Sequence, residues 1–134
     1  MSLATWKAIH YAVTAEAAAA LGDLAAVRHA MWKWGGLSAE VLAMHDVFVD
    51  TPHIRDDDDM VLKIASETCA LCERHEGCKT CPLFEAFGGI SCSDNFADDS
   101  QPYDVWYDTG DPAPMQAALA AAEQYVLAQM EPPR

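Results

Sequence analysis

Residues 69–92 read CALCERHEGCKTCPLFEAFGGISC and contain every cysteine of the 134-residue chain. The five thiols follow the pattern C-x2-C-x5-C-x2-C-x10-C and belong to Cys69, Cys72, Cys78, Cys81 and Cys92. A C-x2-C pair can place two sulfurs on one ion from a single backbone turn, and structural zinc takes four such ligands in a tetrahedron. The spacing therefore predicts one structural zinc ion.

Five thiols exceed the four ligand positions of such an ion. Either Cys92 is a spare buried thiol, or it binds the metal and one of Cys78 and Cys81 is the spare. His75, between the two pairs, is a third type of candidate ligand, although a solvated histidine is the favoured interpretation in so short a polar loop. An iron–sulfur cluster, a redox dithiol and plain buried thiols are the alternatives to zinc, but the ferredoxin spacing C-x2-C-x2-C-x3-C-P is absent.

The type of metal site follows from what the chain lacks. A catalytic zinc needs an open position, usually with histidine or carboxylate ligands and a general base. The chain contains no H-E-x-x-H motif, and no H-x-E followed by P-C-x-x-C. The remaining histidines fall on different expected elements: His10, His29, His45 and His53. Without a nucleophile–base pair or a glycine-rich phosphate loop, a non-enzymatic protein with a structural zinc is expected.

Upstream of the cysteines, apolar residues recur at helical spacing. Helices are predicted over residues 5–21 and 23–34, ended by Gly22 and Gly35-Gly36, and from Ser38 to near Thr51-Pro52. A further helix is expected to begin in the aspartate run 56–59, where negative charge suits the positive end of the helix dipole, and to lead to Cys69. Residues 1–68 are therefore predicted to form the helical part of the protein.

Downstream, residues 69–111 contain many glycines and prolines, which favours loops and short helices stapled by the metal. The aromatic segment 102–107 is expected to pack this region onto the helices. Residues 112–130 have the clearest helical stripe of the chain. The expected fold is a single mainly α domain over residues 1–134, a small bundle of about five helices with a zinc-stapled, loop-rich cysteine region.

The charge of the chain limits its partners. Residues 1–50 carry a net charge of −2 and residues 51–134 a net charge of −11, which together give −13. Such a field repels phosphate backbones and attracts basic surfaces, so direct nucleic-acid binding is disfavoured and a protein partner with a basic surface is expected. The lack of an 18-residue apolar run or a signal-like start, and the clustered cysteines, predict a cytoplasmic protein with no membrane association.

One sequence pattern has a counterpart elsewhere. Cys69-x2-Cys72, Cys78-x2-Cys81-Pro82-Leu83, Cys92 and Tyr103-x2-Trp106, followed by an amphipathic helix, resemble a pattern in small uncharacterised phage and prophage proteins. The resemblance covers about residues 69–127. It implies a mobile-element origin and a metal site, but no particular activity.

Three functions are compatible with these features. The favoured one is an acidic adaptor or inhibitor of a basic partner, by analogy with small acidic anti-CRISPR proteins that occupy nucleic-acid channels. The second is a zinc-dependent nucleic-acid-binding regulator. The third is a thiol redox protein that uses Cys78 and Cys81.

Overall fold

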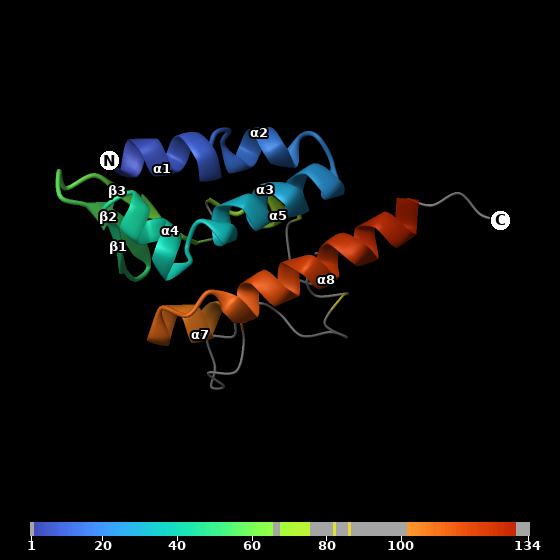
Figure 1. Cartoon of the computed structure of the whole chain (residues 1–134). Coiled ribbons are helices and arrows are strands. Elements are labelled where there is room, and N and C mark those ends of the chain that lie inside the picture. The colour runs from blue at the N-terminus through green and yellow to red at the C-terminus, as the bar shows by residue number, and fades with distance from the viewer. Residues whose placement is uncertain (1, 66–67, 76–81, 83–85, 87–101, 131–134) are drawn as a thin grey trace.

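The computed structural model describes residues 2–65, 68–75, 82, 86 and 102–130. It is mainly helical, as expected, and adds a small three-stranded sheet (Figure 1). The helices are α1 (Leu3–His10), α2 (Ala15–Ala19), α3 (Asp23–Gly35), α4 (Ala39–Met44), α5 (Ala70–Arg74), α7 (Pro102–Thr109) and α8 (Ala113–Met130). The strands are β1 (Val47–Asp50), β2 (His53–Asp56) and β3 (Val61–Lys63).

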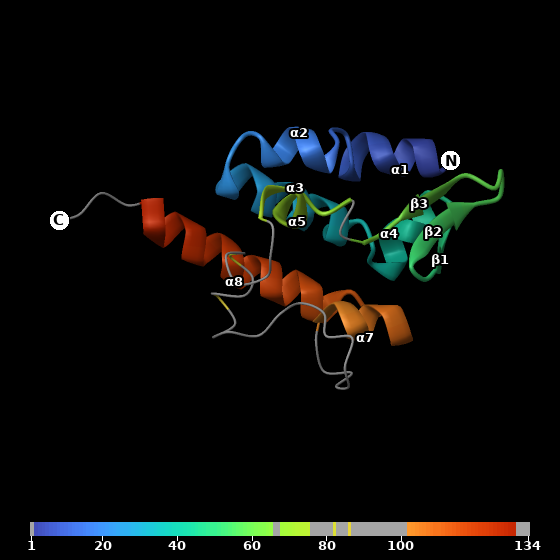
Figure 2. The ribbon, with the colours of Figure 1, turned by 180° about the vertical axis from the view of Figure 1, so that it is seen from behind.

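Helix α3 lies at the centre of the molecule. Helices α1 and α2 run along one side of it and α8 along the other, and the sheet forms one end (Figures 1 and 2). Helix α5 lies behind α3 in Figure 1 and in front of it in Figure 2. The predicted helix 23–34 is confirmed as α3, with Val27 and Trp34 buried and Trp32 exposed on the opposite face. None of the helices in the described part of the chain has the length and apolar character needed to cross a bilayer.

The C-terminal helix is also confirmed. Its predicted stripe faces the core, where Met115, Ala118, Leu119, Ala122 and Val126 are all buried. Met130, at the end of α8, is exposed. Because α8 packs against both α3 and α7, the stripe has a partner along its length.

The single helix expected over residues 5–21 is wrong, because two helices occupy this segment. Thr14 starts the second of them: its hydroxyl accepts a hydrogen bond from the N–H of Ala17 at 3.2 Å. The carbonyl of Val13 is bonded instead by a ring nitrogen of His29, at 2.8 Å. Side chains thus bond the backbone groups that are left without helical partners at the break. The free-energy cost of ending one helix and beginning another is therefore small.

The helices expected from Ser38 to Thr51 and over residues 56–68 are wrong beyond α4. Residues 47–63 form an antiparallel sheet in the order β1-β2-β3 instead. Val47, Phe48 and Val49 are β-branched or aromatic, and such residues favour a strand when alternate ones can be buried. Val47 is buried and Phe48 exposed, which is the alternation of a strand with one covered face.

The aspartate run serves a hairpin turn and does not begin a helix. Residues 57–59 form a three-residue loop closed by a hydrogen bond from the N–H of Asp56 to the carbonyl of Met60 at 3.1 Å. Asp59 ends the turn with a φ of 60°, a left-handed conformation that aspartate adopts more readily than most residues.

Asp56 connects this hairpin to the start of the chain. Its Oδ2 atom accepts a hydrogen bond from the N–H of Leu3 in the first turn of α1, at 2.8 Å. Its Oδ1 atom accepts hydrogen bonds from the N–H groups of Asp58 and Met60, at 3.0 and 3.2 Å. One buried carboxylate therefore holds the turn and binds a helix terminus whose N–H groups have no partner within the helix.

The substitution Asp56→Asn is expected to make the protein less stable near neutral pH. The hydrogen bond from Leu3, and those within the turn, lower the pKa of Asp56. A lowered pKa stabilises the fold above the carboxyl's unfolded value of about 3.9, and that stabilisation is lost as the pH falls through the folded value. Thermal unfolding across this pH range should show the variant and the wild type converging in acid. Asp57→Asn, at the exposed next position, is the control, and an equal effect at both positions would contradict this role of Asp56.

The aromatic segment after the cysteines packs as predicted. Trp106 is fully buried, with its ring 5.3 Å from that of Trp34 and nearly perpendicular to it. Tyr103 contacts both rings, and its hydroxyl donates a hydrogen bond to the carbonyl of Ile64. Tyr107 is half-exposed. This cluster joins α7 to α3 and to the chain that follows the sheet.

Candidate metal centre

The two described cysteines lie at the beginning of a short helix. Cys69 is the residue that precedes α5, and Cys72 lies within it, so they do not hang from the end of an upstream helix as expected. Cys78, Cys81 and Cys92 lie outside the described residues. Of the thiols predicted to surround one ion, the structure therefore describes only the first pair.

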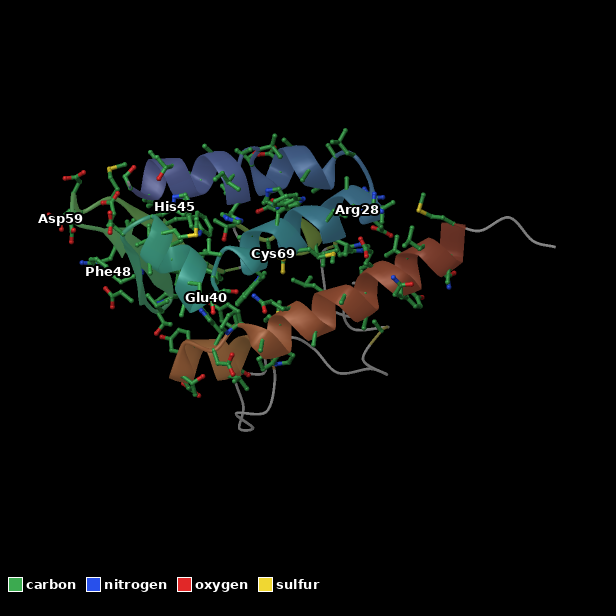
Figure 3. The ribbon with its side chains drawn as sticks, in the orientation of Figure 1. Arg28, Glu40, His45, Phe48, Asp59 and Cys69 are labelled. Atoms are coloured by element: carbon green, nitrogen blue, oxygen red, sulfur yellow. The ribbon has the colours of Figure 1, made fainter. Side chains whose placement is uncertain are left out.

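Burial of α5 fixes where this pair lies. Ala70 and Leu71 are fully buried and belong to the main core, and α5 packs against α2 and α3. Cys69, labelled in Figure 3, is consequently half-buried against the core. Cys72 is exposed. One thiol thus lies against the helices while the other faces outward.

The surroundings of Cys69 favour the thiolate. A hydrogen bond from the Cys72 thiol lowers the pKa of Cys69 to about 5 against the opposing effect of burial, and the charge of Lys33 contributes further. Zinc binds cysteine as the thiolate, so a pair whose first member ionises readily and whose second member is a turn away matches the metal's donor chemistry. The two residues present therefore fit half of a structural zinc site.

Lys33 is the unexpected residue of this region. Its side chain on α3 is only 1% exposed, and its ammonium donates a hydrogen bond of 2.7 Å to the carbonyl of Thr68, the residue before Cys69. A buried cation is costly unless charges of opposite sign lie close to it. The Cys69 thiolate, whose formation Lys33 favours, would supply that sign. A zinc ion with four thiolates would still carry about −2.

His75 has a partner different from the one expected. Its Nε2 lies 2.9 Å from Oδ1 of Asp23, which also accepts a hydrogen bond from Nε of Arg74. Burial opposes ionisation of Asp23, but these bonds outweigh it and lower the pKa of that carboxyl. Only 16% of the His75 side chain is exposed, so the interpretation as a solvated histidine is wrong. The three residues hold the end of α5 against the start of α3.

Three of the other histidines make hydrogen bonds within the fold. Ring nitrogens of His10 and His29 bond to the carbonyls of Trp32 and Val13, and Nδ1 of His45 lies 2.9 Å from the hydroxyl of Thr5. Among the described residues, no three His, Cys, Asp or Glu side chains are grouped closely enough to hold a metal ion. A complete site would therefore need ligands from outside the described ranges.

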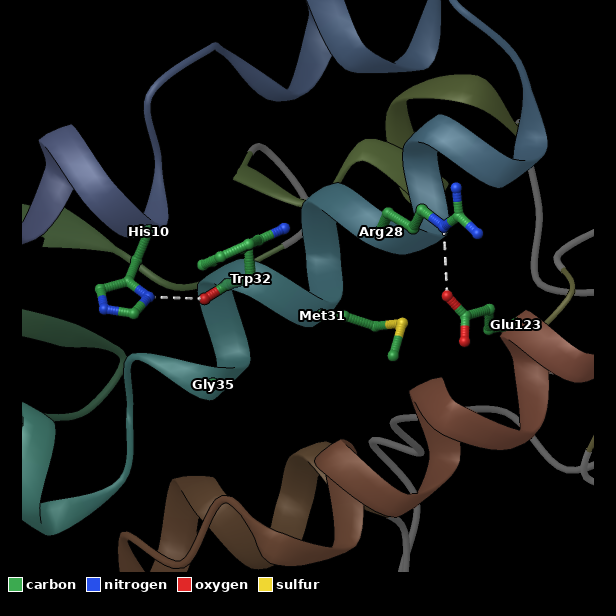
Figure 4. Close-up of a pocket in the computed structure, with 6 residues that line it drawn as sticks. All are labelled: His10, Arg28, Met31, Trp32, Gly35 and Glu123. Atoms are coloured by element: carbon green, nitrogen blue, oxygen red, sulfur yellow. Dashed lines mark hydrogen bonds and ion pairs between the residues drawn. The ribbon is translucent and has the colours of Figure 1, made fainter.

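A hollow of about 400 Å³ lies away from the cysteines. Figure 4 shows it between α1, α3 and α8, lined by His10, Arg28, Met31, Trp32, Gly35 and Glu123. Arg28 and Glu123 form an ion pair of 3.2 Å across its edge. Within these lining residues no nucleophile stands beside a base, so the hollow lacks the arrangement of a hydrolytic site.

Comparisons with known proteins add no constraint. No protein family matches the chain, and no significant match was found among curated proteins or solved structures. The chemistry of the cysteine pair and the charge of the surface therefore carry the functional argument.

Proposed function

We propose that this protein is a non-enzymatic, zinc-stabilised acidic binding protein that acts as an adaptor or inhibitor of a partner with a basic surface. The observation that carries the proposal is that the described arginines are already neutralised. Arg28 pairs with Glu123, Arg55 with Asp50 and Arg74 with Asp23, in a chain whose net charge is −13. The positive charge of each of these arginines is therefore balanced by a carboxylate of the same chain.

The described lysines do not change this balance. Lys33 is buried, which leaves Lys7 and Lys63 as the exposed ones in the described ranges. Carboxylates are far more numerous on the same surface and include Asp57, Asp58 and Asp59 at the hairpin tip. A negative surface of this kind is attracted to grooves built for phosphate and repels nucleic acid itself.

Zinc has a structural role in this proposal. The readily ionised Cys69 and the adjacent Cys72 would supply two of its ligands, and others would come from Cys78, Cys81 and Cys92. The ion would then hold the acidic segment after α5 to the helices through a helix that is itself anchored in the core. The resemblance to phage and prophage proteins implies a mobile-element origin. The target in host defence is proposed by analogy of composition with small acidic anti-CRISPR proteins.

The complex with the partner is expected to weaken steeply with salt. A basic protein captured by the immobilised chain would be purified, and its affinity measured at about 0.05 M and about 0.5 M salt, where the Debye length falls from roughly 14 to 4 Å. Affinity should drop about tenfold or more, and nucleic acid that binds the partner should compete with the protein.

Two results would contradict the proposal. Binding that is insensitive to salt would show that charge does not direct recognition. Retardation of duplex or single-stranded nucleic acid by the protein alone, near physiological salt, would favour the alternative of a zinc-dependent nucleic-acid-binding regulator. A chain with its exposed aspartates 57–59 changed to asparagine is the matched control for the salt series.

A further inference from the structure

The three-stranded sheet has one covered face and one open face. Val47, Ile54 and Asp56 are 4%, 0% and 4% exposed and point towards the helices. Phe48 and Val61 are 45% and 48% exposed. Because successive side chains of a strand point to opposite faces, these two lie on the face away from the core.

The register brings the open side chains together. Phe48 pairs with Arg55, and Arg55 pairs with Val61, so the three form one row across the sheet. The next row consists of Asp50, His53 and Lys63. We call these six residues the open sheet face. Side chains opposite each other in neighbouring strands are in reach of one another, so two exposed apolar groups flank one arginine.

Arg55 is incompletely satisfied within this row. Its Nη2 lies 3.0 Å from Oδ2 of Asp50, which holds the guanidinium in place. Its Nε atom is buried and has no hydrogen-bond partner among the described residues. A buried donor without an acceptor is unfavourable.

The surroundings of the open sheet face are negatively charged. Residues 46–63 contain six aspartates against one arginine and one lysine, but Asp56 is buried on the covered face and Asp50 is paired with Arg55. Asp57, Asp58 and Asp59 are exposed at the hairpin tip, and Met60 beside them is 61% exposed. Phe48 and Asp59 both lie at the sheet end of the molecule (Figure 3). Exposed apolar side chains beside a charged rim are a common composition of a protein interface.

We propose that the open sheet face docks a protein segment in which leucine-like apolar side chains are flanked by lysine or arginine. This inference rests on the proposed function and names the surface that serves it. The apolar side chains would cover Phe48 and Val61, and the basic ones would lie against the aspartates of the hairpin. Exposed aromatic and methionine side chains are enriched at such contacts, and charge complementarity selects the basic partner.

The test uses a synthetic peptide of leucine and lysine as the probe. One control peptide has glutamate in place of lysine, and another has serine in place of leucine. The double variant Phe48→Ser/Val61→Ser is expected to bind the probe at least about tenfold more weakly than wild type. The triple change of residues 57–59 to asparagine should also weaken binding and flatten its salt dependence. Leu21→Ser, at a 78% exposed residue outside the sheet, should bind like wild type.

The outcomes separate this surface from the proposed function. Equal binding of the probe, or of the captured basic partner, to wild type and to the double variant would overturn the surface while acidic recognition stands. Failure of the wild type to bind the probe and any basic partner at low salt would overturn both. Thermal unfolding of each variant shows whether it is folded, and Phe48→Ala replaces the double variant if that one is not.

Discussion

One equivalent of zinc per chain is expected in protein purified without added metal, and its removal by a strong chelator is expected to lower the unfolding midpoint sharply. The physical reason is that α5, which follows Cys69 and contains Cys72, packs its buried Ala70 and Leu71 against the core. Structural zinc contributes on the order of 10 kcal/mol to the folding of isolated zinc fingers. Here the helices have a core of their own, so a loss of several kcal/mol is the expected scale. Elemental analysis and circular dichroism during heating would measure both quantities.

The controls for this experiment use the chain's own cysteines. The same chelator already saturated with zinc should leave the midpoint unchanged. Cys69→Ser and Cys72→Ser should each lose zinc, whereas serine at the spare among Cys78, Cys81 and Cys92 should keep it. Protein without bound metal, or metal loss without any change in stability, would exclude the structural zinc. Rapid alkylation of Cys78 and Cys81 in the purified protein would favour the redox alternative.

The fold was predictable where the spacing of apolar residues along one helix was sufficient to identify the buried face. Helices α3 and α8 carry apolar residues every three or four positions, and Val27, Trp34, Leu119 and Val126 are buried as that spacing requires. The sheet was not predictable in this way, because the short apolar run from Val47 suits a strand or a helix equally. Its choice depends on the partner strand and on the covered face, which are contacts distant in sequence.

Asp56 shows the same limit at a single residue. Four consecutive aspartates suit the start of a helix by their charge. The acceptor that Asp56 provides is used by Leu3, 53 positions earlier in the chain. Local propensity could not include that contact. The hydrogen bond between Leu3 and Asp56 favours the hairpin over the helix.

Some features of the candidate metal centre were predictable from the sequence and others were not. The spacing of Cys69 and Cys72 predicted a pair of thiols close together, and a hydrogen bond links them. Lys33 was missed although a signal existed, since it follows the buried Ala26 and Ala30 on the same face of α3. The bond between His75 and Asp23 joins residues 52 positions apart and had no local signal.

Trp106 is packed so that its substitution is expected to reduce the stability of the protein strongly. Its side chain is 0% exposed, and Trp34 and Tyr103 surround it with ring centroids at 5.3 and 5.7 Å. Its indole Nε1 is buried without a hydrogen-bond partner in the described part of the chain. Packing therefore accounts for its contribution, and the cluster is the main aromatic contact between α7 and α3.

Trp106→Ala is expected to lower the free energy of unfolding by about 3–5 kcal/mol, because a buried tryptophan leaves a cavity that its neighbours fill only in part. That is a large share of the roughly 5–15 kcal/mol that holds a typical domain folded. Trp106→Phe should cost about 1–2 kcal/mol, because it keeps a ring and removes an unsatisfied N–H. Urea unfolding would measure both variants, with Tyr107→Ala, a half-exposed neighbour on the same helix, as the control. A loss below about 1 kcal/mol for Trp106→Ala would show that α7 is not packed on the core through this residue.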